Sequence, residues 1–376
     1  MKRVLLIENS SLDFFSARSA LAIYLIQKGW EVYALIPNDE HVQKIRDLGI
    51  HVIVKELDRS NKGIIQLLRL IKTYRQIIRR YDIDIIHSFR FQPNLVNTLA
   101  NFFNTKRVII HITGLGIAFS NKSLKYLLFR LVSHLIFQFK LFRADRVIVQ
   151  NEEDGNDMWF YRFWKDKISV INGSGINTSV FNNELYNKSQ LRSSLGINQQ
   201  NTVFICISRL IWEKGIREMV TAFELVARSN NHIKLIIVGW SDEDNPRHVD
   251  NLFIERYKNH SSVAFLGRKS NVKELLAASD VFLYPSYYRE GIPRGILEAL
   301  SMSLPIITTN TPGCNLTVVP GENGYLIPPR STQHIGEAIG NILNDDLASM
   351  GLRSRLLAKS KFSDQIVFSS IEELYH

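Results

Sequence analysis

A chain of 376 residues with ordinary apolar and charged fractions, 45% and 22%, is long enough for two globular domains of roughly 150 residues each. Its only two cysteines, Cys206 and Cys314, exclude a disulfide framework and favour an intracellular protein. The net charge of +10 is one-sided, because residues 1–180 hold 26 Lys and Arg against 16 Asp and Glu. A basic first half predicts contact with nucleic acid or with an anionic membrane surface.

The chain opens with the βαβ pattern of a doubly wound sheet. Lys2–Glu8 predicts a strand, Asn9–Asp13 a polar turn, the residues to about Gln27 a helix, and Trp30–Pro37 the next strand. Open α/β sheets bind ligands at such turns, so Ser10-Ser11 is a candidate site. The turn lacks G-x-G-x-x-G, which argues against a nicotinamide or flavin site. The opening run MKRVLLIENSS turns polar too soon for a signal peptide.

Helices and strands continue to alternate through the first half. Ile64–Tyr81 and Phe89–Asn104 predict helices, Ile83–His87 a buried strand, and Arg107–Ile112 a strand that ends in Thr113-Gly114.

The segment Ser123–Phe142 is apolar but is interrupted by Lys125, Arg130, His134 and Lys140. Charges are costly inside a bilayer, so this segment is not expected to span one. A basic amphipathic helix lying on a membrane fits the pattern. The alternative is an interior helix whose few charged groups reach water along their stems.

The second half follows a connector at Asn172–Gln200 that is rich in Asn, Ser and Gly. Strands again alternate with helices, which indicates a second parallel sheet. The expected strands are Thr202–Ser208, Lys234–Gly239, Val263–Gly267, Val281–Tyr284 and Pro305–Thr308.

The segment Tyr284–Pro312 reads as a strand end, a loop, a helix and a strand. Proline is favoured in a first helical turn, so Pro293 predicts a helix start whose free N–H groups attract phosphate. Glu290 and Glu298 would lie about 12 Å apart along a helix, too far to work on one bond but suited to the two ends of an extended ligand. The alternative is a pair of solvated carboxylates.

Arg209 and Lys214 follow the end of a predicted strand, where open α/β sheets bind ligands. A guanidinium fork and an ammonium can stabilise a leaving diphosphate without a metal. Alone, the pair is more typical of solvated loop charges. The acidic run Asp242–Asp244 is read as a solvated loop, so no metal site is predicted.

Together these motifs resemble family 4 of the retaining, nucleotide-sugar-dependent glycosyltransferases. EGIPRGILEA resembles its E-x7-E element, SRLIWEKG its R-x4-K-G element, GSGIN its inter-domain segment, and LGR with ASDVFLYPS its nucleotide-binding stretch. The resemblance implies the GT-B fold, two Rossmann-like doubly wound parallel-sheet domains facing a cleft. Residues 1–172 would bind the acceptor and 173–360 the nucleotide sugar, and a C-terminal helix in 361–376 would cross back onto the first domain.

In the second domain the resemblance implies that Glu290 contacts the donor sugar, Glu298 the ribose, and Arg209 and Lys214 the diphosphate. It further implies donor contacts from Gly239, Arg268, Ile292, Pro293, Arg294 and Gly295. The family's retention is ascribed to front-side attack within an ion pair. We therefore expect no protein nucleophile, no cofactor and no metal.

On the acceptor side, Ser10 and Ser11 stand where most members carry a glycine pair. Thr113 stands before Gly114 where many members carry a histidine, and His111 lies two residues earlier on the same strand face. We expect Ser10, Ser11, Thr113 and Gly114 to border the acceptor, and the histidine's role stays open between Thr113 and His111.

Within the family, ITGLGIAF, QNEED and TPGC most resemble a branch of bacterial surface-glycan enzymes. That branch includes N-acetylgalactosaminyl transferases that extend sugars on undecaprenyl diphosphate. We therefore expect a retaining transferase that moves N-acetylgalactosamine or a related hexose from a UDP-sugar to an undecaprenyl-diphosphate-linked glycan. It would be cytoplasmic and peripheral on the inner membrane face, held by its basic N-terminal domain.

Two alternatives remain. One is a UDP-sugar 2-epimerase-like enzyme with the same architecture, although none of that enzyme's motifs is seen. The other is a non-catalytic protein that binds glycan or nucleic acid. The presence of Glu290, Arg209 and Lys214 argues against a non-catalytic protein. The basic helices carry mainly aliphatic faces, so no nucleic-acid partner is expected.

Overall fold

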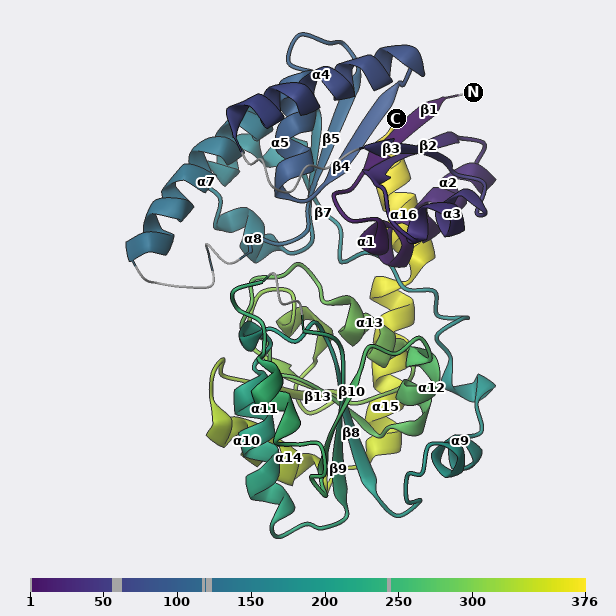
Figure 1. Ribbon diagram of the computed structural model, residues 1–376, viewed down its shortest axis with the longest axis vertical. Helices are drawn as coiled ribbons and strands as arrows, with labels where there is room; N and C mark the ends of the chain where they lie inside the picture. The colour runs from purple at the N-terminus through teal and green to yellow at the C-terminus, as the bar shows by residue number, and fades with distance from the viewer. Residues whose placement is uncertain (1, 56–62, 117–118, 120–123, 242–244) are drawn as a thin grey trace. The chain divides into compact units, whose positions relative to one another are not determined.

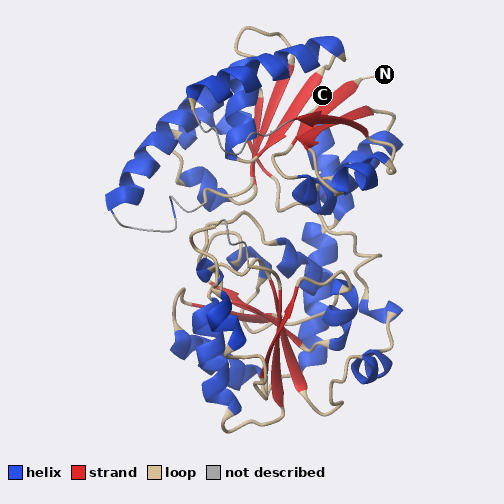
Figure 2. Ribbon diagram, viewed as in Figure 1, coloured by secondary structure: helices blue, strands red, loops and turns tan. Residues whose placement is uncertain are grey.

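The computed structural model of the protein describes residues 2–55, 63–116, 119, 124–241 and 245–376 (Figure 1). The chain divides into two compact units, one of Met1–Gly175 with Asp364–His376 and one of Ile176–Ser363. Each unit alternates strands with helices (Figure 2). The two Rossmann-like parallel-sheet domains predicted from the sequence are confirmed.

The first unit is built on a parallel sheet with the strand order β3-β2-β1-β4-β5-β6-β7. Its strands are β1 Arg3–Ile7, β2 Glu31–Pro37, β3 His51–Lys55, β4 Ile85–Phe89, β5 Arg107–Ile112, β6 Arg146–Val149 and β7 Ile168–Val170. Side chains alternate across a strand, so Val4 and Leu6 of β1 enter one apolar core, and Leu5 and Ile7 enter the core on the other face. Burial on both faces explains why β1 is continuously apolar.

Helices cover both faces of this sheet. The helices are α1 Ser11–Ala17, α2 Ser19–Gln27, α3 His41–Arg46, α4 Ile64–Arg80, α5 Phe91–Ala100, α7 Leu124–Arg143, α8 Glu152–Asn156 and α16 Asp364–Glu373. The C-terminal helix α16 packs against α2, and Trp30 and Tyr24 both donate to Glu372 on it, at 3.0 and 2.9 Å. These contacts hold the C-terminal segment in the first unit (Figure 1).

Several predicted boundaries in the first unit are wrong. The turn expected at Asn9–Asp13 is helical from Ser11, because the Ser10 hydroxyl accepts the backbone N–H of Asp13 and caps α1. Phe89 closes strand β4 rather than opening a helix, and α5 begins at Phe91. The helix ends at Ala100, where the Asn101 backbone N–H donates to Asn97.

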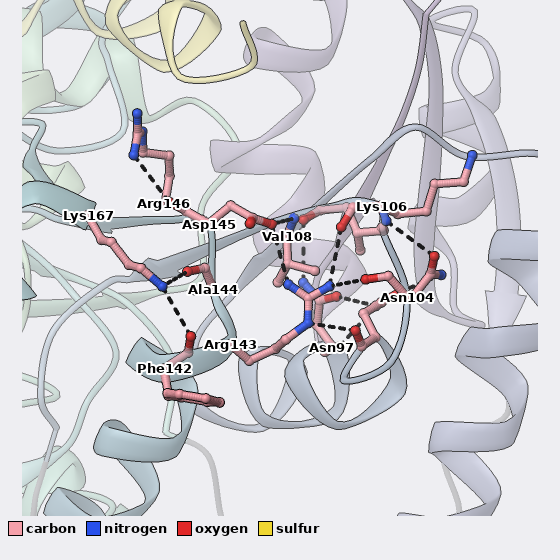
Figure 3. A network of polar contacts seen from close by, with 12 residues as sticks. Asn97, Asn104, Lys106, Val108, Phe142, Arg143, Ala144, Asp145, Arg146 and Lys167 are labelled. Carbon is pink, nitrogen blue, oxygen red and sulfur yellow. Dashed lines mark hydrogen bonds and ion pairs between the residues drawn. The ribbon is translucent and has the colours of Figure 1, made fainter.

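Helix α7 is anchored at its C-terminal end by two cations (Figure 3). The Arg143 guanidinium donates to the carbonyl oxygens of Asn101, Asn104 and Lys106, at 2.6, 2.8 and 3.3 Å. The Lys167 ammonium donates to the carbonyls of Phe142 and Ala144, at 3.1 and 2.9 Å. Lys167 satisfies carbonyls at the end of α7, and Arg143 satisfies one carbonyl at the end of α5 and two in the loop that follows, so both cations are structural.

Two of the charged groups that suggested a basic amphipathic helix, His134 and Lys140, lie in the core. Lys140 is fully buried, its ammonium donates to the Phe91 carbonyl at 2.9 Å, and burial lowers its pKa to about 7. His134 is 4% exposed and stacks on Trp159. What α7 does expose is an apolar stripe at helical spacing, formed by Leu124, Leu127, Leu128, Leu131 and Leu135.

No helix in the described part of the chain has both the length and the hydrophobicity needed to cross a membrane.

The second unit is built on a parallel sheet with the strand order β10-β9-β8-β11-β12-β13. Its strands are β8 Thr202–Ile207, β9 Ile233–Val238, β10 Val263–Gly267, β11 Val281–Tyr284, β12 Ile306–Thr309 and β13 Gly324–Ile327. Strand β13 was not predicted, because it begins at Gly324 and is followed by Pro328-Pro329, residues that read as a loop. Cys206 lies buried in β8, and burial raises the pKa of its thiol to about 12, as expected of an inert core cysteine.

The helices of this unit are α9 Lys188–Ser194, α10 Ile216–Ala227, α11 Asn251–Glu255, α12 Val272–Ala278, α13 Arg294–Ser301, α14 Thr332–Ile342 and α15 Leu347–Leu357. Strand order reverses between β8 and β11, which are neighbours although a long segment separates them in sequence. The loops that follow these two strands therefore meet at one edge of the sheet.

Candidate functional site

The loop after β8 carries Lys214 into this edge through a tight turn. Trp212–Lys214 forms one turn of 3₁₀-helix, and Gly215 follows with φ of 71°. A Cβ on Gly215 would lie 2.3 Å from the carbonyl oxygen of Pro285, in the loop after β11. Glycine is therefore required both by the left-handed backbone and by the close approach of the two loops.

Lys214 is almost fully buried, and its ammonium donates to the Tyr284 hydroxyl at 2.5 Å and to the Glu290 carboxylate. The nitrogen also stands 5.1 Å from the centre of the Tyr284 ring. Because β8 and β11 are neighbours, residues 76 positions apart in the chain form one ion pair.

Glu290 accepts from three groups, all at Oε1. Besides Lys214, these are the Tyr284 hydroxyl at 2.9 Å and the Ser286 hydroxyl at 3.3 Å. Among the described residues no hydrogen bond goes to Oε2, which leaves that oxygen for a ligand. Burial alone would raise the pKa of Glu290, but Lys214, Tyr284 and Arg209 together hold it below its ordinary value. The carboxylate is thus ionised at neutral pH.

A second contact fixes the loop that carries Lys214. Glu213 is 2% exposed and forms an ion pair with Arg247, and its carbonyl accepts the backbone N–H of Tyr287 at 2.9 Å. Glu213 therefore ties together the two loops that supply Lys214 and Glu290. Its role was not predicted, since a Glu beside a Lys in a loop gives no signal of burial.

Helix α13 begins at Arg294, with Pro293 as its N-cap residue at φ −63° and ψ 124°. Proline was predicted inside the first helical turn, and it lies one position before it. A Cβ on Gly295 would lie 3.0 Å from the Ile207 carbonyl oxygen at the end of β8. The helix start therefore lies directly against the strand end from which Arg209 and Lys214 follow.

Glu298 forms an ion pair with Arg294 at 2.9 Å, four residues back on α13. Its side chain is 13% exposed. Burial raises the pKa of this carboxyl, and Arg294 only partly opposes the rise. Glu298 is therefore half-buried and already paired, rather than the solvated carboxylate of the alternative reading.

The remaining donor-side candidates surround this edge. Arg209 is exposed, and it acts electrostatically on Glu290. The Arg268 guanidinium stands 5.4 Å from the centre of the Trp240 ring. A Cβ on Gly239 would lie 1.8 Å from the Ser208 carbonyl oxygen, so only glycine fits after β9. Ile292 is buried in the core. Trp240 was missed, because a single tryptophan after a strand is usually a packing residue.

In the first unit the acceptor-side candidates lie at the ends of two strands. Ser10 and Ser11 follow β1: the Ser10 hydroxyl caps α1, and the Ser11 hydroxyl donates to Asp39. Thr113 and Gly114 follow β5 and are half-buried. Both serine side chains are thus engaged in holding the loop, which their polarity alone did not reveal.

His111 is a core residue. It is 1% exposed, contacts Gln150 Nε2 at 3.2 Å and stacks on His87. Burial first, and Arg18 second, lower the pKa of His111 well below its ordinary value, so it is neutral. Its burial among packed side chains is that of a structural strand residue.

The acidic run Asp242–Asp244 lies outside the described residues. Within those residues no group of three or more His, Cys, Asp and Glu side chains is arranged to hold a metal ion.

Comparisons with known proteins fit this geometry. The family model "Glycosyl transferases group 1" matches residues 187–361, and "Glycosyl transferase 4-like" matches residues 3–151. The chain is 25% identical over 378 residues to the N,N'-diacetylbacillosaminyl-diphospho-undecaprenol alpha-1,3-N-acetylgalactosaminyltransferase of Campylobacter jejuni, covering 99% of this chain and 98% of the relative. It is 24% identical to the capsular polysaccharide biosynthesis glycosyltransferase CapM of Staphylococcus aureus, covering 94% and 91%.

Among solved structures, Anabaena Alr3699/HepE in complex with UDP and glucose matches with a TM-score of 0.82 at 19% identity, over 100% of this chain and 99% of that one. This likeness shows the fold.

Proposed function

The chain belongs to the group 1 glycosyl transferases, and on this premise we propose that it is a retaining enzyme that moves a sugar from a UDP-sugar to a polyprenyl-diphosphate-linked glycan. The observation that carries the proposal is the Lys214–Glu290 pair at the point where strand order reverses. That point is where open α/β sheets bind nucleotides.

The donor-side residues suit a diphosphate leaving group. Lys214 and Arg209 supply two cations against the one carboxylate of Glu290, so this edge has a surplus of positive charge. The first N–H groups of α13, at Arg294 and Gly295, add donors at the positive end of a helix dipole. These groups would stabilise the charge that builds on the diphosphate as its bond to the sugar breaks.

Glu290 would orient the sugar rather than attack it. Its Oε1 is held by Lys214 and Tyr284, and its Oε2 accepts nothing else in the described residues, which suits a hydrogen bond from a sugar hydroxyl. The acceptor oxygen would bond to the anomeric carbon on the face that the diphosphate leaves, and its proton would pass to a diphosphate oxygen. This route retains the anomeric configuration and needs no protein nucleophile, metal or cofactor.

The relatives support a lipid-linked acceptor. The Campylobacter relative is named for an acceptor on diphospho-undecaprenol, as is an alpha-1,3-galactosyltransferase of Escherichia coli that is 25% identical over 79% of this chain and 76% of the relative. N-acetylgalactosamine is the donor sugar that we test first.

Such an acceptor requires the enzyme to work at a membrane, and we assign the docking face to α7. The exposed stripe begins with Leu124 at 82% exposure and continues through Leu128 at 65% and Leu135 at 59%. Phe160 and Phe163, in the segment after α8, add 70% and 77% exposed rings, with Arg162 and Lys165 exposed beside them. Apolar side chains flanked by cations suit the interface of an anionic inner leaflet.

The docking face can be tested with anionic and neutral vesicles. A Leu128→Asn, Leu131→Asn variant is expected to lose most binding to vesicles of phosphatidylglycerol, while Leu225→Asn, on the exposed face of α10, changes nothing. Equal binding by all three proteins would remove the assignment.

The transfer reaction is tested with a panel of UDP-sugars and a short polyprenyl-diphosphate-linked N-acetylhexosamine, in EDTA, following UDP release and product mass. We expect acceptor-dependent addition of one sugar, abolished by Glu290→Ala and by Lys214→Ala but not by Lys234→Ala. Free sugar without acceptor would instead indicate an epimerase or a hydrolase. The absence of both turnover and UDP binding would refute the proposal. Turnover that requires a divalent metal would refute its metal-free mechanism.

A further inference from the structure

The first unit has its own reversal of strand order, between β1 and β4, and an ion pair crosses it as well. Glu8 follows β1 and Arg90 follows β4, and the Arg90 Nε lies 3.3 Å from the Glu8 Oε1. This pair stands in the first sheet where Lys214–Glu290 stands in the second. The proposed function assigns the second pair to the donor and leaves the first without a role.

Arg90 is held in a backbone conformation that arginine rarely adopts. Its φ is 70° and its ψ is 176°, a region that is nearly restricted to glycine. The backbone N–H donates to the His111 carbonyl at 3.1 Å, which fixes the strained turn against β5. Glycine at this position would relieve the strain. The presence of a strained arginine instead indicates that the Arg90 side chain has a function.

Below Arg90 lies a fully buried carboxylate. Glu8 has no exposed surface, and its Oε1 accepts the Asn9 backbone N–H at 3.0 Å as well as facing Arg90. Arg18 approaches Oε2 at 3.6 Å, and no hydrogen bond reaches Oε2 from the described residues. Burial raises the pKa of Glu8, and Arg90 and Arg18 oppose the rise. Glu8 therefore orients the guanidinium of Arg90 from inside.

The outer side of Arg90 is accessible. Its Nη2 donates to Asp13 Oδ2 at 2.7 Å, and the two side chains are 37% and 38% exposed. Donor and acceptor groups thus lie side by side at the surface, in the loop edge that also carries Ser10. A guanidinium beside a carboxylate offers both kinds of hydrogen bond to adjacent hydroxyls.

Charge decides which ligand suits this pair. At the accessible surface the guanidinium of Arg90 is matched by the carboxylate of Asp13, whereas Glu8, Arg18 and Lys55 are buried. An exposed cation paired with an exposed carboxylate favours a neutral polyol over a diphosphate, which the carboxylate repels. Resting on the proposed function, we propose that Arg90 and Asp13 bind the hydroxyl groups of the acceptor sugar, with Glu8 as the positioning residue.

The test separates sugar recognition from turnover by measuring binding. Farnesyl diphosphate and its N-acetylglucosamine and N-acetylgalactosamine conjugates are titrated calorimetrically into wild type, Arg90→Lys and Asp13→Asn. Arg90→Lys keeps the charge and Cβ and loses the fork, and Asp13→Asn keeps the shape. Each is expected to bind the preferred conjugate about 10-fold or more weakly, as loss of a charged hydrogen bond implies, with farnesyl diphosphate unchanged. Arg46→Lys and Asp47→Asn, exposed at the end of α3, are the controls.

Equal loss for the conjugate and for farnesyl diphosphate would assign the pair to the diphosphate and overturn the inference. Unchanged conjugate binding by Arg90→Lys and Asp13→Asn would also overturn the inference. The same holds if the wild-type protein binds neither conjugate more tightly than farnesyl diphosphate. Glu8→Gln is expected to raise the acceptor KM and to lower the melting temperature, because it removes a fully buried carboxylate from beside Arg18 and Arg90, while UDP affinity stays near that of wild type. A variant that merely unfolds would lose UDP binding too. Failure of the proposed function is read separately, as absence of transfer from any UDP-sugar.

Discussion

Replacing Lys214 leaves the carboxylate of Glu290 without the ammonium that pairs with it. The Lys214 side chain is 4% exposed and that of Glu290 22%, so Lys214→Met leaves a largely buried charge. Breaking such a pair from one side costs about 3–5 kcal/mol, and the hydrogen bonds from Tyr284 and Ser286 that remain place the expected cost near 3 kcal/mol. Adding Glu290→Gln removes the isolated charge, so the double variant should recover about 1–2 kcal/mol.

The assay is a double-mutant cycle in urea at pH 7, followed by circular dichroism. We expect a coupling energy of about 1.5–3 kcal/mol between the two positions, with similar m-values for all four proteins. The matched control is the exposed pair Lys258 and Glu255, with 71% and 64% exposed side chains, whose coupling should be below about 0.5 kcal/mol. Additive effects of Lys214→Met and Glu290→Gln within the error of the control would refute the reasoning.

The same pair predicts a pH dependence. The pKa of Glu290 in the folded protein lies below its ordinary value, because Lys214, Tyr284 and Arg209 outweigh the effect of burial. A depressed carboxyl pKa contributes stability above the unfolded-state value, near pH 4.3, and loses it as the pH falls through the folded value. The stability difference between wild type and Glu290→Gln should therefore be constant at neutral pH and shrink in acid. A difference that grew in acid would contradict the depressed pKa.

Three further changes test other parts of the structure. Glu298→Gln should weaken UDP binding, which calorimetry measures, and should stabilise the protein at neutral pH. Burial raises the pKa of the Glu298 carboxyl, so its contribution to stability is lost as the pH rises through that pKa. A lower melting temperature of Glu298→Gln at neutral pH would contradict this prediction. Lys140→Met should raise the melting temperature, and most strongly below pH 7. Burial lowers the pKa of the Lys140 ammonium to about 7, so between pH 7 and pH 10.5 the unfolded chain binds more protons than the folded protein. An unchanged melting temperature at pH 6 would contradict this prediction. Gly215→Ala should lower the free energy of unfolding by about 2–3 kcal/mol, through backbone strain and collision with Pro285. The control Gly29→Ala has a similar φ and open space around its Cβ, and it should cost about 1 kcal/mol. Equal losses in urea unfolding would show that the two loops can separate.

The paired residues of the donor site were predictable from sequence because two patterns fix them. A strand end places Lys214, a second strand end places Glu290, and the β–α alternation implies that such ends share one edge. The hydroxyl of Tyr284 was not predictable as their common partner. Tyr284 is the last residue of an apolar strand, where aromatic residues usually pack, and only the strand register turns its ring toward Lys214.

Helix α7 shows the opposite limit. Periodicity located the helix to within a residue at its C-terminal end, but it left open whether the charged groups face solvent or the interior, and the structure buries His134 and Lys140. Lys140 and Arg143 look like solvent-facing cations in the sequence, but the Lys140 ammonium donates to the Phe91 carbonyl at the start of α5, and the Arg143 guanidinium donates to the Asn101 carbonyl just after α5 ends. A helix that is apolar on two sides carries no sequence signal that tells its core side from its exposed side, since packing of α5 against it decides that.

The two strand reversals suggest why one fold serves two different substrates. Both place an ion pair across the reversal, and both leave one member reachable from the outside. In the second unit the additional charge is a cation, Arg209, and the edge suits a diphosphate. In the first unit the additional charge is a carboxylate, Asp13, which pairs with Arg90. The same arrangement then suits neutral hydroxyl groups. Asp13→Asn should therefore weaken sugar recognition and at the same time improve binding of inorganic diphosphate to the first unit, a gain that a purely structural Asp13 would not give.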